Sequence, residues 1–310
     1  MKIGILGTGS LGSTFGGLLT EAGADVWLIG RPQSDHIKTM KRQGLTLVEG
    51  STERCVPVKV ATDCREVGPV DLLIVLVKSY ATREAMEGAG ALIGDATTAL
   101  SLQNGLGNEE ILIERLGENR VLGGKTYVGG VVISPGRVMI GTKGKPTYIG
   151  EWDGAGTDRV VRTANLLTKA GLETRISPDI RAVIWSKLLI NVATGAISGI
   201  ARLPYGKLNQ VKEAVECGAA AVAEAIAVAH ANGVDLTGVV PHEIWNKATE
   251  GLPFDFKTSM LQDIEKGSRT EIDFINGAVV RFGERVGVPT PVNRTLVAGI
   301  KGIEFSLKKG

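Results

Sequence analysis

Three glycines near the start of the chain have the spacing of a phosphate-binding turn. The run Gly7-Thr8-Gly9-Ser10-Leu11-Gly12 follows a short apolar stretch at 2–6 and precedes a segment of helical periodicity at 11–22. In such a strand-turn-helix the first glycine permits the bend, the second lets the backbone approach a pyrophosphate, and the third lets the helix pack close to the strand. Unpaired N–H groups and a positive dipole at the helix start favour an anion there. A coincidental glycine-rich turn is the alternative, but the place between strand and helix leads us to predict dinucleotide binding.

Two basic residues indicate which dinucleotide is bound. Arg31 closes a second apolar strand at 25–29, where a carboxylate would bind the ribose of NAD and an arginine suits the 2′-phosphate of NADP. Lys78 follows a near-continuous apolar run at 70–77, and ligands of open α/β sheets lie at the carboxyl ends of such strands. The arginine favours NADPH, and Lys78 is placed to meet a phosphate or an adenine. Ordinary surface side chains are the alternative interpretation of both.

A lysine and an asparagine have helical spacing within an apolar stretch. Lys187 and Asn191, in the run 181–191, are four residues apart and therefore share a helix face. Partial desolvation lowers the pKa of a lysine toward neutrality, which is what a general acid requires. The spacing alone favours a simpler interpretation, in which the lysine stem covers apolar surface and the ammonium stays in water.

Two more polar residues fall at the ends of expected elements. Asn104, in the turn at 103–108, follows the strand 98–102 and would lie beside a nicotinamide, although Asn-Gly is also a common turn without chemistry. Glu271, in the run 259–277, is expected to begin a helix. The helix dipole favours any carboxylate at such a position, so the position does not by itself make Glu271 catalytic.

The elements that must position these residues divide into two sets. Strand and helix patterns alternate up to Ser177-Pro178, which have the residue types of a helix start. Beyond that point nearly all the periodicity is helical. We therefore predict an α/β Rossmann-type dinucleotide-binding domain at 1–177 and an all-α helical-bundle domain at 178–310, each supplying one wall of a cleft. The further strands are expected at 45–48, 56–60, 121–133, 137–140, 147–150 and 173–176, and the helices at 159–170, 180–197, 208–231, 241–249, 259–266, 269–286 and 293–307.

Composition limits the remaining classes of protein. A chain of 310 residues with 43% hydrophobic and 22% charged residues matches a soluble protein of two domains. The net charge of +2, without a basic block, argues against a nucleic-acid partner, and Lys308-Lys309 is interpreted as a solvated tail. No uninterrupted apolar run reaches the roughly 18 residues of a membrane span. The scattered Cys55, Cys64 and Cys217 have no metal-site spacing and cannot all pair, which favours a reduced, cytoplasmic location and no bound metal. The alanine-rich helix at 214–231 is expected in the interior or at a homodimer interface.

The sequence resembles the ketopantoate reductase (2-dehydropantoate 2-reductase) family over essentially its whole length. The marks of the family occur in order: the glycine turn, the arginine closing the second strand, Val77-Lys78, the Q-N-G-L-G turn at 103–107, the W-x-K-L run at 185–188, and S-M-L-Q-D at 259–263 with T-E-I-D-x-I-N-G at 270–277. Two of these marks are specific: the W-x-K-L run at 185–188, and the combination of the runs at 259–263 and 270–277. A generic dinucleotide-binding dehydrogenase would not carry both.

The resemblance implies a reaction and a role for each residue. NADPH would deliver a hydride to the C2 carbonyl of ketopantoate, giving (R)-pantoate for pantothenate and coenzyme A biosynthesis. Lys187 would be the general acid that also contacts the substrate, and Glu271 would hydrogen-bond the hydroxyl being formed. The remaining residues would bind substrate or cofactor: Asn191 and Ser259 the substrate, Asn104 both substrate and nicotinamide, and Arg31 and Lys78 the phosphate end of NADPH.

The chain departs from the family pattern at two positions. Gly195 and Tyr205 stand where asparagines on the substrate side are expected. A missing hydrogen-bond partner in a buried cleft changes which substrate a site selects. Ketopantoate is the first choice of substrate. The alternatives are a reductase of a different 2-keto acid on the same scaffold and a dinucleotide sensor without catalysis.

Overall fold

The chain divides into two compact units. The computed structural model describes residues 1–141 and 144–307, so the Lys308-Lys309 tail lies outside the described residues. The first unit comprises Met1–Gln103 and Asn108–Val183, and the second comprises Asn104–Gly107 and Ile184–Gly310. The division after Val183 falls inside a helix, just beyond the boundary that the sequence places at Ser177-Pro178.

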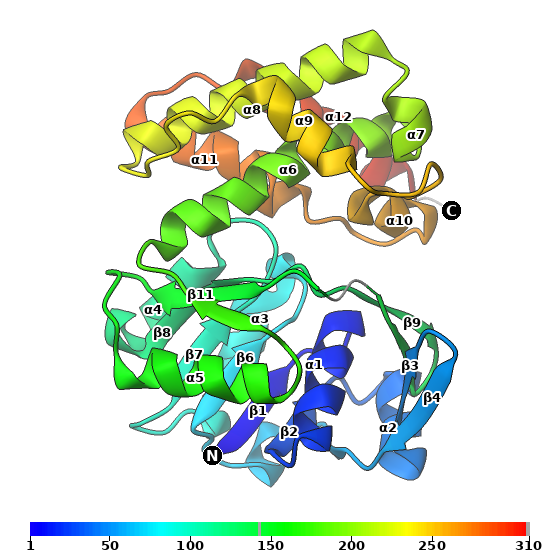
Figure 1. Cartoon of the computed structure of the whole chain (residues 1–310), viewed down its shortest axis with the longest axis vertical. Coiled ribbons are helices and arrows are strands. Elements are labelled where there is room, and N and C mark those ends of the chain that lie inside the picture. Colours follow the sequence, from blue (N-terminus) through cyan, green and yellow to red (C-terminus); the bar gives the residue numbers. More distant parts are fainter. Residues whose placement is uncertain (142–143, 308–310) are drawn as a thin grey trace. The chain divides into compact units, whose positions relative to one another are not determined.

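The first unit is built on an eight-stranded sheet in the order β12-β11-β8-β7-β6-β1-β2-β5 (Figure 1). All neighbouring strands in it are parallel except β8 and β11, which are antiparallel. Because β2 and β6 flank β1, the turn after β1 leaves the middle of the sheet at its carboxyl edge. The strands are β1 (Lys2–Leu6), β2 (Asp25–Ile29), β5 (Lys59–Ala61), β6 (Leu72–Val75), β7 (Thr98–Ser101), β8 (Val121–Lys125), β11 (Thr147–Glu151) and β12 (Thr174–Ile176).

The first unit also contains a second, separate sheet of four strands in the order β4-β3-β10-β9. Its strands are β3 (Leu45–Glu49), β4 (Thr52–Val56), β9 (Gly130–Ser134) and β10 (Arg137–Ile140). The predicted partner strand at 56–60 was wrong in position, since β3 turns directly into β4 and β5 starts afterwards at Lys59. The single predicted strand at 121–133 is two strands, β8 and β9, which belong to different sheets. The local apolar pattern did not separate them.

Helix α1 (Ser10–Glu21) lies between the two sheets. A Cβ on Gly16 would come 2.4 Å from Leu28 of β2, and a Cβ on Gly17 would come 2.8 Å from Leu47 of β3. The adjacent glycines therefore let α1 pack closely against both sheets. The other helices of the unit are α2 (Asp35–Gln43), α3 (Thr82–Gly88), α4 (Asn108–Leu116) and α5 (Asp158–Lys169).

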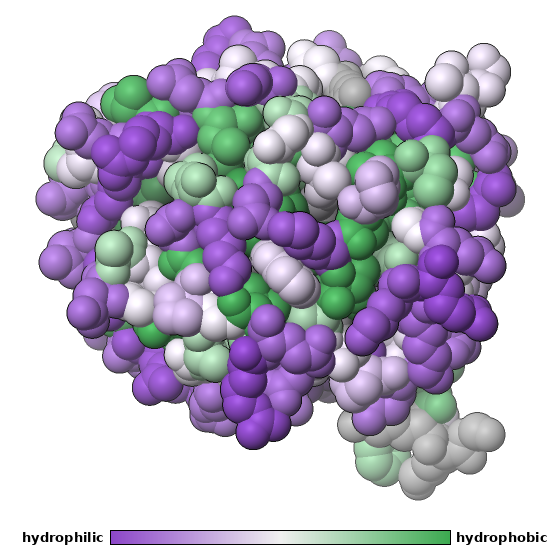
Figure 2. Space-filling model, turned by 90° about the horizontal axis from the view of Figure 1, so that it is seen from below, coloured by the Kyte–Doolittle hydropathy of each residue, from purple (hydrophilic) through white to green (hydrophobic). Residues whose placement is uncertain are grey.

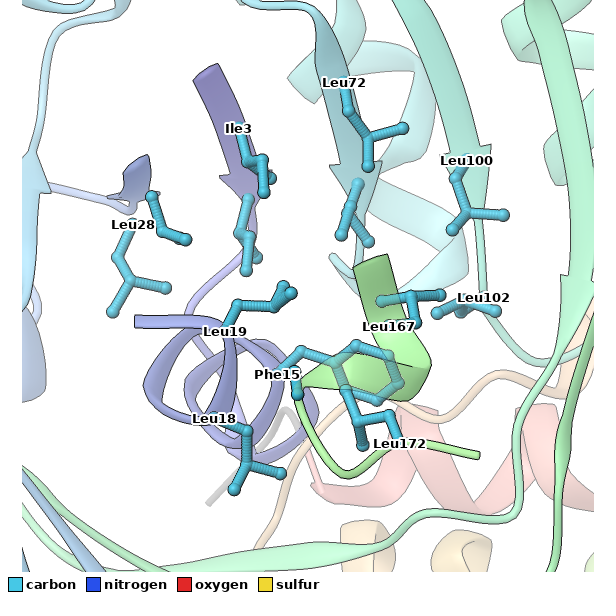
Figure 3. Close-up of a cluster of buried hydrophobic side chains, with 14 of the residues drawn as sticks. Ile3, Phe15, Leu18, Leu19, Leu28, Leu72, Leu100, Leu102, Leu167 and Leu172 are labelled. Atoms are coloured by element: carbon cyan, nitrogen blue, oxygen red, sulfur yellow. The ribbon is translucent and has the colours of Figure 1, made fainter. Parts of the chain in front are cut away.

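Hydrophobic cores cover both faces of the main sheet. On one face, Phe15 and Leu19 of α1 and Leu167 of α5 pack with Ile3, Leu72 and Leu100 of the strands (Figure 3). On the other face, Met86 of α3 and Leu112 of α4 pack with Leu73 and Val75. Successive residues of β6 thus enter opposite cores, as expected for a parallel strand buried on both sides.

The described residues of the second unit form helices joined by loops and turns, with no strand among them. Its helices are α6 (Ile180–Ala201, which starts in the first unit), α7 (Tyr205–Leu208), α8 (Lys212–Ala231), α9 (Pro241–Thr249), α10 (Ser259–Glu265), α11 (Asn276–Val286) and α12 (Pro291–Leu307). The predicted helix at 269–286 was wrong at its start, because Ile272–Phe274 form a short 3₁₀ turn and α11 begins at Asn276. Glu271 therefore precedes a 3₁₀ turn and does not begin an α-helix.

Two helices, α6 and α8, are long and apolar enough to cross a membrane by length and composition, but 67% and 44% of their apolar windows are buried inside the protein. Glu224, a charged residue of α8, accepts hydrogen bonds from the backbone N–H groups of Val292 and Asn293 at the start of α12. The molecular surface seen from below is mainly hydrophilic, with smaller apolar areas between the polar side chains (Figure 2).

Candidate active site

The glycine turn between β1 and α1 has the geometry of a phosphate cradle. Gly7 has a φ of +104°, and a Cβ on Gly12 would lie 1.8 Å from the carbonyl oxygen of Gly7, so neither position accepts a side chain. Gly9 has an ordinary φ of −68°, and no atom lies within 4 Å of the place its Cβ would take. No side chain caps α1, and its first turn has no acidic residue. The fold itself does not require glycine at position 9, and the open space suits a pyrophosphate approaching the backbone.

A half-buried histidine, His36, supports this turn from α2. The Nδ1 atom of His36 accepts a hydrogen bond from the N–H of Gly136 at 2.9 Å, which assigns the ring proton to Nε2. Nε2 then donates to Oγ of Ser13 at 2.9 Å, and Ser13 donates to the carbonyl oxygen of Thr8 at 3.2 Å. Burial lowers the pKa of His36, which favours the neutral form of the ring. No local pattern in the sequence indicates this support, because its members are distant in the chain.

Arg31 and Lys78 lie on the two sides of the glycine turn. Arg31 follows β2 and Lys78 follows β6, the two strands that flank β1 in the parallel part of the sheet. Both side chains are exposed. They are therefore accessible to a phosphate or an adenine at the carboxyl edge of the sheet.

A buried polar network ties the segment at Lys78 to the start of α4. Gln103 donates through Nε2 to the carbonyl oxygen of Val77 at 2.8 Å and to Oγ1 of Thr82 at 2.7 Å. Thr82 in turn donates to Oδ1 of Asn108 at 3.0 Å. The strand ends of β6 and β7 are thus fixed relative to each other by satisfied internal hydrogen bonds.

Glu109 is a buried carboxyl group that no sequence pattern indicates. An acidic residue in the first turn of a helix is usually explained by the helix dipole in solvent, yet Glu109 is only 1% exposed. Burial, together with the nearby Glu110, raises its pKa to about 8. Its Oε2 atom has no hydrogen-bond partner among the described residues. Glu109 is therefore protonated at neutral pH.

Asn104 and Glu271 meet within the second unit. Asn104 donates through Nδ2 to Oε2 of Glu271 at 3.4 Å, across 167 positions of sequence. The neighbouring backbone joins the same segments, since Leu106 N–H donates to the carbonyl oxygen of Phe274 at 2.9 Å. Gly105 is required at this contact, because it has a φ of +87° and its Cβ would lie 2.3 Å from the same oxygen. Glu271 is 6% exposed, so a carboxylate and an amide are held together in a largely buried place.

The other predicted substrate-side residues also belong to the second unit. Lys187 and Asn191 are half-buried residues of α6, one helical turn apart, between buried neighbours such as Leu188 and Val192. Ser259 is exposed at the first position of α10, and the preceding Thr258 caps that helix by accepting the N–H of Leu261. Every residue predicted to touch substrate thus lies in one unit, and the glycine turn, Arg31 and Lys78 lie in the other.

The two departures from the family pattern have distinct surroundings. The hydroxyl of Tyr205 is 3.1 Å from Oγ1 of Thr194, and its ring stacks on Phe256 with 6.1 Å between centroids. A Cβ on Gly195 would make an ordinary contact of 3.7 Å with Met260. Tyr205 therefore uses its hydroxyl inside the protein, and Gly195 contributes no polar group.

Among residues 1–141 and 144–307, no group of three or more His, Cys, Asp or Glu side chains is arranged to hold a metal ion.

Comparison with known proteins gives the same relationship for both parts of the chain. Residues 3–154 match the family model Ketopantoate reductase PanE/ApbA, and residues 179–304 match Ketopantoate reductase PanE/ApbA C terminal. The 2-dehydropantoate 2-reductase of Pyrococcus horikoshii is 36% identical over 304 residues, which is 98% of each chain. That of Archaeoglobus fulgidus is 34% identical over 99% of each chain.

Solved structures resemble the whole chain as well. The PanE/ApbA family ketopantoate reductase from Ralstonia eutropha JMP134 superposes with a TM-score of 0.90 at 33% identity, covering 99% of this chain and 100% of that one. A D-mandelate dehydrogenase solved with NADH and anilino(oxo)acetate has a TM-score of 0.91 at 28% identity, with the same coverage.

Proposed function

Because the chain belongs to the ketopantoate reductase family of oxidoreductases, we propose that it reduces the C2 carbonyl of ketopantoate to (R)-pantoate with NADPH. This reaction would serve pantothenate biosynthesis in the cytoplasm. The observation that carries the proposal is the hydrogen-bonded pair of Asn104 and Glu271, in the same unit as Lys187. Lys187 could supply the proton to a keto oxygen, and the amide and carboxylate of the pair could hydrogen-bond the substrate.

The first unit supplies the cofactor site in this proposal. Gly7, Thr8, Gly9, Ser10, Leu11 and Gly12 would hold the pyrophosphate at the start of α1, where the turn leaves open space at Gly9. Arg31 supports NADPH over NADH, because a guanidinium binds a phosphate through two parallel hydrogen bonds. Lys78 would add a second positive charge from the other side of the turn. When bound, the dinucleotide supplies the hydride.

The second unit manages the proton and the substrate. Lys187 would donate a proton to the carbonyl oxygen as negative charge develops there, which is worth on the order of 10²–10⁴ in rate. Glu271 would accept a hydrogen bond from the hydroxyl that forms, while it also holds the amide of Asn104 in place. Asn191 and Ser259 would bind the remaining polar groups of the substrate.

The test is a turnover assay on the purified full chain. NADPH and ketopantoate are mixed with the protein, and absorbance of the reduced nicotinamide is followed. We expect oxidation of NADPH by the wild type and by Lys247→Ala, which alters an exposed lysine of α9, and a loss of about 10²-fold or more in turnover for Lys187→Ala with nearly unchanged NADPH affinity. Oxidation with other 2-keto acids but not ketopantoate would reassign the substrate. NADPH binding without turnover on any 2-keto acid would reject the enzymatic proposal.

A further inference from the structure

Lys125, the last residue of β8, is a buried cation. It is 8% exposed, and within residues 1–141 and 144–307 its ammonium group has neither a hydrogen-bond partner nor an ion pair. Lysine is almost never buried in this way unless it is paired. Two aromatic rings take the place of a partner: the Lys125 ammonium lies 4.6 Å from the ring centroid of Tyr127 and 6.0 Å from that of Tyr148.

Further positive charge surrounds this group. The ammonium of the exposed Lys145 lies 5.4 Å from the same Tyr127 ring. In the sheet, Tyr148 of β11 pairs with Lys125 on one side and with Arg175 of β12 on the other, so the three side chains form a row across adjacent strands. Among residues 1–141 and 144–307, the carboxylate that pairs with this row is Glu173, 2.8 Å from Arg175 at its outer end.

The side chains of this row lie on the face of the main sheet opposite to α1. Leu122 belongs to the core under α1, whereas Val121 belongs to the core under α3 and α4. Since side chains alternate along a strand, Lys125 shares the face of Val121. None of these residues has a part in the reaction proposed above.

We propose that Lys125, Tyr127 and Lys145 form a binding site for a small oxyanion, a carboxylate or a phosphate group. Such an anion supplies the charge that a buried ammonium otherwise gains from a paired carboxylate. Lysine is a compact point charge that binds either type of oxygen, and the exposed Lys145 adds attraction at the entrance. Burial, and to a lesser extent the charge of Lys145, lowers the pKa of Lys125 to about 8, which agrees with a positive site that lacks its anion.

The test measures binding of inorganic phosphate and, separately, acetate to the full chain by calorimetry at low ionic strength in a zwitterionic buffer. We expect saturable binding with a single stoichiometric site for one or both probes. Lys125→Met should weaken that binding by about tenfold or more, because a charge-assisted contact is lost. Lys145→Met changes only an exposed side chain and should weaken it by a smaller factor. Lys169→Met, at the exposed end of α5, is the matched control and should bind like the wild type.

The outcomes separate this site from the cofactor turn. Phosphate that binds only at the glycine turn would bind Lys125→Met as tightly as the wild type, and that result would overturn the proposal. Absence of saturable binding by both probes would overturn it too. A response to phosphate alone, or to acetate alone, supports the site and identifies which oxyanion it takes.

Discussion

Replacing Lys125 with methionine is expected to stabilise the protein at neutral pH. Burial lowers the pKa of this lysine from 10.5 to about 8, which at about 1.4 kcal/mol for each pH unit corresponds to about 3 kcal/mol against the charged form in the folded state. We reduce this to about 2 kcal/mol, because residual solvent at the 8% exposed side chain screens the charge. Methionine has a similar length and no charge. Lys125→Met should therefore raise the free energy of unfolding by about 2 kcal/mol at pH 7.

The pH dependence gives the sharper test of the same reasoning. Between pH 8 and 10.5 the unfolded chain retains the lysine proton and the folded protein has lost it, so wild-type stability rises with pH across this window. The methionine variant lacks this contribution. Its advantage should thus be complete below pH 8 and should fade toward pH 10.5.

The assay is urea unfolding followed by tryptophan fluorescence, at pH 7 and at pH 10, in buffers without phosphate or carboxylate. The quantity compared is the difference in free energy of unfolding between variant and wild type, in which other titrating groups cancel. A variant less stable than the wild type at pH 7, or an advantage of equal size at both pH values, would refute the reasoning. Added phosphate should reduce the advantage if the oxyanion site exists.

Three further predictions concern the first unit. Glu109 keeps its proton in the folded state up to about pH 8 and loses it near pH 4.5 when unfolded, so wild-type stability should fall as pH rises through this window. Glu109→Gln, which mimics the protonated group, should abolish that fall in urea titrations at pH 5 and pH 8. If the variant loses as much stability between these pH values as the wild type, the buried-acid assignment is contradicted. Gly12→Ala should destabilise the fold by about 2 kcal/mol or more, because its Cβ meets the carbonyl of Gly7. Gly9→Ala should melt like the wild type yet bind NADPH about tenfold more weakly. Normal NADPH binding by Gly9→Ala would contradict pyrophosphate binding at this turn. Arg31→Ala should weaken NADPH by about tenfold or more and NADH much less, in fluorescence titrations of both cofactors; equal weakening would exclude contact with the 2′-phosphate.

Local patterns in the sequence predicted the classes of the two parts of the chain. The alternation of strand and helix in the first part and the helical spacing in the second follow from side-chain periodicity, which each element carries within itself. The apolar run ending at Val77 became a strand buried on both faces, with Leu72 and Leu73 in opposite cores. The glycine spacing was informative for the same reason, because a strained turn demands glycine at fixed positions.

Features that depend on distant contacts could not be predicted in this way. Nothing in the run near Glu271 indicates that Asn104 lies within hydrogen-bond distance, since 167 positions separate the two residues. Glu109 has the sequence context of an exposed helix-start carboxylate but is buried. The end of β8 also has no local mark, so the burial of Lys125 between two tyrosine rings was missed.

The turn at Asn104–Gly107 belongs to the second unit, although the residues before and after it belong to the first. The helical unit is therefore encoded by two separated stretches of the gene. A recombinant fragment starting at Ile184 would lack the tetrapeptide whose backbone pairs with Phe274. A chimera of two family members joined at Val183 would combine this tetrapeptide from one parent with the 271–274 segment of the other. Domain exchange within the family should accordingly transfer residues 104–107 together with the helical unit.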